Sequence, residues 1–188
     1  GNGGRNAFML FLDTDSTNGG AASLSGISGT PNGFGIANNL SFNSSTFTPN
    51  VGILVGNKYG DGQNFASFDI GQSPQENFGQ GVYELTSNSV ADLTGFSGTG
   101  RPISQWGDRG DSANAGIEIA IPLSSLGLSV GDRFLAAGIF CGTNNGTSRW
   151  LSREAYGESV TGATANSSAF GYNAVTLIGS LVYLSAQE

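Results

Sequence analysis

The chain has 188 residues, of which 31 are glycine and 11% are charged, with a formal net charge of −7, no histidine and one cysteine. This length fits a single domain over residues 1–188. The sequence lacks the clustered Lys and Arg that nucleic acid and anionic membranes require, and it has no apolar run long enough for membrane insertion, so these partners are excluded. A surface rich in hydroxyl and amide groups favours an extracellular or cell-surface protein.

Short apolar runs bounded by Gly, Asn, Ser and Pro are typical of strands joined by turns. The first run, residues 6–13, is nearly continuous in apolar side chains and predicts a central strand buried on both faces. Further short strands are predicted over residues 33–42, 51–55, 65–70 and 81–85. The polar connector over residues 87–111 is expected to be irregular and is a candidate functional loop.

The second half of the chain begins with a clean alternation over residues 116–122, which predicts a strand with its isoleucines on one face. A helical turn or tight corner is expected next, followed by two apolar runs that form a hairpin and by a long run that bends or splits at Gly179. These elements are predicted over residues 123–128, 133–141, 149–156 and 172–184. The pattern indicates an all-β fold, a two-layer antiparallel β-sandwich of jelly-roll type.

Catalysis is disfavoured by the residue types that are missing. Without histidine the chain cannot build a Ser/His/Asp or Cys/His nucleophile system. Its single cysteine, Cys141, excludes an intrachain disulfide and is expected to be a buried thiol. A glycosidase would need only two carboxylates, and Glu118 and Glu154 lie on predicted strands. Because a solvent-facing Glu is ordinary on such strands, we expect a protein that is not an enzyme.

A cluster of oxygen-bearing side chains directly follows the first predicted strand. Asp13, Asp15, Thr17 and Asn18 precede two glycines that suit a tight loop. Hard oxygen ligands at this spacing are what Ca²⁺ accepts, so these four residues form a candidate calcium site. The alternative is an ordinary turn in which aspartate side chains accept hydrogen bonds from backbone N–H groups.

Four aromatic residues lie in or beside predicted loops: Trp106, Trp150, Tyr59 and Tyr156. Exposed aromatic rings can stack on the apolar faces of sugars, which suggests a polysaccharide ligand. The alternative is that Trp150 and Tyr156 lie on a strand and fill the core.

Two segments carry a resemblance to a known group of proteins. Residues 116–141 (GIEIAIPLSSLGLSVGDRFLAAGIFC) and residues 8–15 (FMLFLDTD) resemble segments of DOMON-like and family 9 carbohydrate-binding-module-like β-sandwiches, especially uncharacterised secreted bacterial members. The resemblance implies a sandwich fold and relatives that bind sugars or haem. Haem ligation in those relatives uses Met with His or Lys. We expect no haem here, since histidine is absent and Met9 lies inside an apolar run.

The position of residues 8–15 adds a further expectation. Relatives place two or more strands before this one, whereas here it follows the first few residues. The resemblance therefore implies that a strand from another chain, or a cleaved N-terminal piece, completes the sandwich. The favoured function is a structural or assembly module that self-associates or binds another chain, within a filament or surface layer. A carbohydrate-binding module and a glycosidase remain the alternatives.

Overall fold

The structure is a computed structural model that describes part of the chain. The described residues are 5–14, 20–25, 40–56, 68–70, 81–86, 90–92, 98–102, 117–119, 121–144, 148–161 and 175–184. Most of them lie in β-strands, and the helical part is one 3-10 turn, η2 (Leu123–Leu126). The predicted all-β fold and the predicted turn after residue 122 are therefore confirmed. Residues 33–39 and 65–67, which belong to two predicted strands, lie outside the described part.

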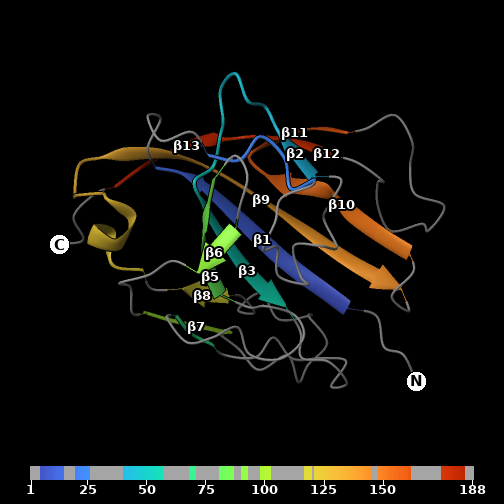
Figure 1. Ribbon diagram of the computed structural model, residues 1–188, viewed down its shortest axis with the longest axis horizontal. Coiled ribbons are helices and arrows are strands. Elements are labelled where there is room, and N and C mark those ends of the chain that lie inside the picture. Colours follow the sequence, from blue (N-terminus) through green and yellow to red (C-terminus); the bar gives the residue numbers. More distant parts are fainter. Residues whose placement is uncertain are drawn as a thin grey trace.

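The largest sheet, sheet A, has the strand order β10-β9-β1-β3-β5-β6, with β13 also paired to β9 (Figure 1). Its strands are β1 (Arg5–Asp13), β3 (Val51–Gly56), β5 (Gly81–Leu85), β6 (Val90–Asp92), β9 (Arg133–Asn144), β10 (Ser148–Tyr156) and β13 (Ser180–Tyr183). Met9 of β1 pairs with Leu54 of β3 on one side and with Ile139 of β9 on the other. The first apolar run of the sequence is thus a central strand, as predicted.

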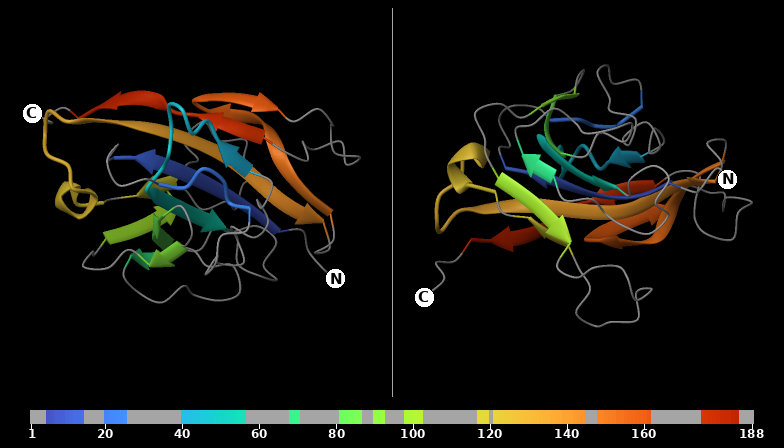
Figure 2. Two further views of the ribbon diagram at one scale, coloured as in Figure 1. Left: turned by 45° about the horizontal axis from the view of Figure 1, so that its top comes forward. Right: turned by 90° about the horizontal axis from the view of Figure 1, so that it is seen from below.

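A second layer, sheet B, has the order β11-β12-β2 and packs against one face of sheet A (Figure 2). Its strands are β11 (Glu158–Thr161), β12 (Val175–Ile178) and β2 (Leu40–Phe42). β2 and β12 run parallel, which departs from the wholly antiparallel expectation. Both strands therefore leave sheet B from the same end, β2 on the way to β3 and β12 on the way to β13.

A small third sheet joins β4 (Phe68–Ile70), β7 (Gly98–Pro102) and β8 (Ile117–Ile119). Two strands, β6 and β7, lie within the connector over residues 87–111 that we expected to be irregular, so that expectation is wrong for these positions. Neither segment alternates clearly between apolar and polar residues. Each is a strand because a neighbour supplies the ladder: β5 pairs with β6, and β4 and β8 pair with β7.

The two main sheets are joined at one corner by two glycines. β10 passes into β11 at Gly157, and β12 passes into β13 at Gly179. Gly157 has a φ of 87°, and a Cβ there would lie 2.9 Å from the carbonyl oxygen of Ile178. A Cβ at Gly179 would lie 2.5 Å from the ring of Phe47. The predicted split of the last strand at Gly179 is confirmed, and close packing at the corner explains it.

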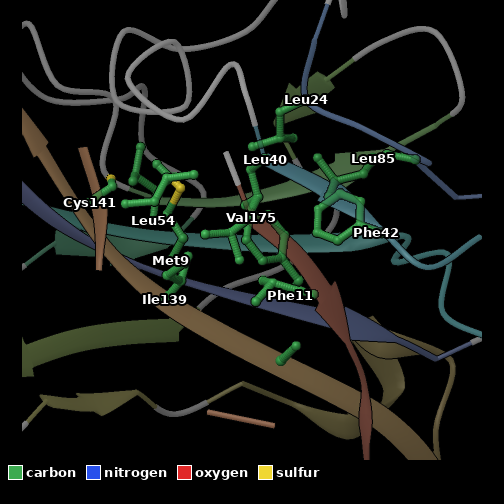
Figure 3. Packing of buried hydrophobic residues seen from close by; sticks show 14 of the residues in the cluster. Met9, Phe11, Leu24, Leu40, Phe42, Leu54, Leu85, Ile139, Cys141 and Val175 are labelled. Carbon is green, nitrogen blue, oxygen red and sulfur yellow. The ribbon is translucent and has the colours of Figure 1, made fainter. Parts of the chain in front are cut away.

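The hydrophobic core lies between sheet A and sheet B (Figure 3). Met9 and Phe11 of β1 point into it and have no exposed surface. The ring of Phe11 packs edge-on against Phe42 of β2, with the centroids 4.8 Å apart, and Phe42 packs in turn against Phe47. Cys141 is fully buried in the same cluster, which confirms the expectation of a buried thiol.

Candidate functional site

The face of sheet A that points away from this core carries an apolar groove. Successive side chains of a strand alternate between faces, so Phe8, Leu10 and Leu12 project opposite to Met9 and Phe11. The groove has a volume of about 480 Å³. It is lined by Phe8, Leu10, Leu12, Ile53, Ile121, Leu126, Phe134, Ala136, Tyr156 and Val182. Leu12 is buried whereas Phe8 and Leu10 are half-buried, so the expectation that β1 is buried on both faces is wrong for these two positions.

The chemistry of the groove is almost entirely apolar. Among its lining side chains only Tyr156 carries a polar group, and 54% of that residue is exposed. Phe140, 46% exposed, packs against Phe8 with the ring centroids 5.0 Å apart. The groove therefore suits aliphatic or aromatic groups better than a ligand that needs many hydrogen bonds.

Among the described residues, β13 lies at an edge of sheet A, next to the groove. On that side of β9, β10 pairs down to Gly138 and β13 begins at Ala136, so the two strands follow one another along one edge. The other side of β9 is occupied by β1. Within the described part of the chain, β13 pairs with β9 alone.

The backbone groups of β13 alternate between β9 and the open side. The N–H of Leu184 donates to the carbonyl oxygen of Asp132 at 3.0 Å, in register with the β13–β9 ladder. Because hydrogen-bonded and non-hydrogen-bonded pairs alternate in an antiparallel ladder, Val182 also bonds toward β9. The N–H and C=O groups of Leu181 and Tyr183 point outward. Their side chains are 46% and 69% exposed.

Of the four aromatic residues that the sequence suggested for sugar binding, the structure describes the side chain of Tyr156 alone. Tyr156 lies in the groove, as stated above. Trp150 is on β10 opposite Gly142, but its side chain lies outside the described part, as do Tyr59 and Trp106 altogether. Tyr156 is exposed, so it does not fill the core as one alternative suggested.

Of the predicted calcium ligands, the structure describes Asp13. Its Oδ2 accepts a hydrogen bond from the backbone N–H of Thr48 at 2.9 Å. The next residue, Thr14, donates its N–H to Oδ1 of Asn50, also at 2.9 Å. These bonds tie the end of β1 to the segment before β3. Asp15, Thr17 and Asn18 lie outside the described residues.

No group of three or more acidic, cysteine or histidine side chains that could hold a metal occurs within the described residues. Glu118 lies on β8 and Glu154 on β10, and the side chains of both fall outside the described part. The glycosidase alternative therefore gains no cleft geometry from these two positions.

Asp13→Ala should lower the free energy of unfolding by about 1–3 kcal/mol, because the Thr48 N–H then loses its acceptor in a half-buried setting. Asp13→Asn keeps a carbonyl oxygen at this position and should cost less. Urea unfolding in the presence of a chelator measures this contribution without any cation. Repeating it with calcium tests the predicted metal site, whose existence requires that calcium stabilise the wild type more than Asp13→Ala. Equal costs for the two variants would contradict the role assigned to this hydrogen bond.

Comparisons with protein-family models, curated proteins and solved structures gave no match for the chain. In the part of the chain that the structure describes, no helix is long and apolar enough to cross a membrane. The groove and the β13 edge are thus defined by the chain's own geometry. Sequence reasoning missed both features. The sequence feature that could have indicated the β13 edge is the uncharged, proline-free run over residues 175–184.

Proposed function

We propose that this domain is a non-catalytic assembly module, of extracellular or cell-surface type, that binds an extended segment of another chain along the outer side of β13. The bound segment would continue sheet A by one strand. The observation that carries the proposal is the outward-facing backbone of Leu181 and Tyr183, together with their exposed apolar side chains.

The other edge strands of sheet A have features that hinder strand addition. β10 carries Arg149, Arg153 and Glu154, and its ladder with β9 shifts register between Leu151 and Ala155. The short strand β6 ends in an aspartate. Charges, irregular pairing and short length protect sheet edges from other chains. β13, with the sequence SLVY, has neither a charge nor a proline.

The groove adds a means of selecting the bound segment. Val182 lines the groove and lies between the two residues whose backbone faces outward. In strand addition, backbone hydrogen bonds supply affinity, and pockets for alternate side chains supply specificity. A side chain of the added strand on the same face would lie beside Val182, at the margin of the groove. An apolar residue at that position fits the lining of the groove.

The test places a proline at position 181, where the backbone N–H makes no hydrogen bond to β9. Leu181→Pro removes an N–H that points outward, so the fold should be retained while strand addition is blocked. Val182→Pro removes an N–H that points to β9 and should destabilise the protein, which checks the assigned direction of the backbone groups. The probe is a fluorescent peptide of residues 180–184 carrying two added lysines, followed by fluorescence anisotropy.

We expect saturable binding to the wild type and at least about tenfold weaker binding to Leu181→Pro, since the segment then loses a donor and meets a bulky ring. Glu84→Gln on β5, an exposed position that β9, β1 and β3 separate from β13, should bind as the wild type does. A peptide that is N-methylated at Leu181 and Tyr183, the residues whose N–H groups would pair with the edge, should fail to bind. Equal binding by wild type and Leu181→Pro would overturn the proposal.

A carbohydrate-binding module is the second candidate, favoured by the exposed ring of Tyr156. Sugar recognition requires hydrogen-bonding groups around a stacking ring, and the groove supplies one phenol hydroxyl. Titration with soluble polysaccharides, compared with Tyr156→Ala, separates the two functions. Binding that is lost in Tyr156→Ala and kept in Leu181→Pro would favour the carbohydrate function.

A further inference from the structure

We infer that the partner at the β13 edge is a second copy of this chain, joined through its own β13 about a two-fold axis that passes between the two Val182 residues. This inference rests on the proposed function and names its partner. Two antiparallel copies of β13 would form a continuous sheet across the axis. A two-fold pair of this kind uses the same surface on both molecules.

The direction of the backbone groups selects this register. An antiparallel hydrogen-bonded pair forms only between residues whose N–H and C=O groups face each other. In β13 the outward groups belong to Leu181 and Tyr183. An axis at Val182 places Leu181 of each copy opposite Tyr183 of the other, so both outward residues find a partner. If the axis passed through Leu181 or Tyr183 instead, part of each β13 strand would extend past the end of the second copy's β13 and stay unpaired.

The side chains agree with the same register. Leu181 would lie opposite Tyr183 of the second copy on one face, which covers two of the most exposed apolar residues described. On the other face the two Val182 side chains would meet, and the two grooves would become neighbours. β13 has no charge to oppose this contact, although each copy carries a net charge of −7. Association should therefore strengthen as added salt screens that repulsion.

Because the edge is short, the pair belongs to the weak, transient class of interfaces, and covalent trapping suits it better than equilibrium measurement. In the proposed register, Val182 of one copy lies opposite Val182 of the other in a non-hydrogen-bonded pair, whose Cα atoms are about 4.5 Å apart. This spacing lies within the range that a disulfide spans, about 4.4–6.8 Å. Val182→Cys should therefore form a disulfide-linked dimer under mild oxidation. The wild type is the control for Cys141, whose thiol is buried.

Matched cysteine variants test the register. Leu181→Cys alone should cross-link at least about tenfold more slowly than Val182→Cys, because Leu181 lies opposite a different residue of the second copy. Mixing Leu181→Cys with Tyr183→Cys should produce the mixed dimer. Combining Leu181→Pro with Val182→Cys should abolish trapping, since the edge can no longer pair. Non-reducing electrophoresis over a time course measures the rate of dimer formation for Val182→Cys, for Leu181→Cys, for the mixture and for the double variant.

Two outcomes would overturn the inference. One is trapping of Val182→Cys no faster than that of Leu181→Cys. The other is trapping that persists when Leu181→Pro is added, which would indicate random collision. The peptide assay then separates the two claims. Continued peptide binding to the wild type would retain strand addition with a different partner, whereas loss of peptide binding as well would reject the proposed function.

Discussion

Phe11→Ala is expected to lower the free energy of unfolding by about 3–5 kcal/mol, the usual cost of removing a large buried ring. Phe11 has no exposed surface and lies between the two main sheets, against Phe42. Removing the ring loses its burial and leaves a cavity that strands of both sheets would have to close. Because backbone ladders hold those strands in place, little collapse is expected. Urea denaturation, monitored by tryptophan fluorescence and by circular dichroism, measures the change.

Phe140→Ala is the matched control. Phe140 is on β9, packs against Phe8 on the groove face and is 46% exposed. Its truncation removes the same atoms from a partly solvated position and should cost about 1 kcal/mol or less. Equal losses for the two variants would contradict the assignment of the core to the Phe11 side of sheet A.

Gly157→Ala should cost about 2–5 kcal/mol, because two separate penalties add. The first is conformational: Gly157 has a φ of 87°, and left-handed backbone costs other residues about 1–2 kcal/mol. The second is steric: the new Cβ would lie 2.9 Å from the Ile178 carbonyl oxygen and 3.3 Å from that of Ala136. Crowding of this kind costs about 1–3 kcal/mol more. Chemical denaturation gives the total.

Gly127→Ala isolates the first penalty. Gly127 ends η2 with a φ of 68°, and a Cβ there meets no atom within 4 Å. The difference between the two glycine variants therefore measures how tightly the corner between the sheets is packed. If Gly157→Ala cost no more than Gly127→Ala, the close approach of β11, β12 and β9 at this corner would be contradicted.

The strands that the sequence predicts well are those whose identity is local. β5 coincides with the predicted range, and β3 and β9 extend the predicted ranges, because each is an apolar run bounded by turn-forming residues. Gly179 was also recognisable, since a glycine within an apolar strand often marks a bend. β11, with the sequence ESVT, was missed because its polar residues resemble a loop and its ladder is provided by β12.

The candidate site was harder to predict because it depends on which strands are neighbours. Leu181 and Tyr183 have the pattern of ordinary core residues, and their exposure follows from the place of β13 at the end of β10. The groove combines residues from β1, β9, β13 and the segment around η2, which no local pattern connects. Tyr156 was found because its aromatic ring lies at the end of a predicted strand, which is a local feature.

The pairing of β9 with β1 on one side and with β10 and β13 on the other also has a consequence for how the chain folds. β9 pairs with β1 from the start of the chain and with β13 from its end, so its ladders join residues that are far apart in sequence. A topology rich in such distant pairings folds slowly, because long loops must close before those pairings contribute. During synthesis β1 can meet β3 early, whereas its second neighbour, β9, lies far beyond β3 in the sequence and is made later. The second sheet that covers the core is completed later still, because β11 and β12 follow β9 in the sequence.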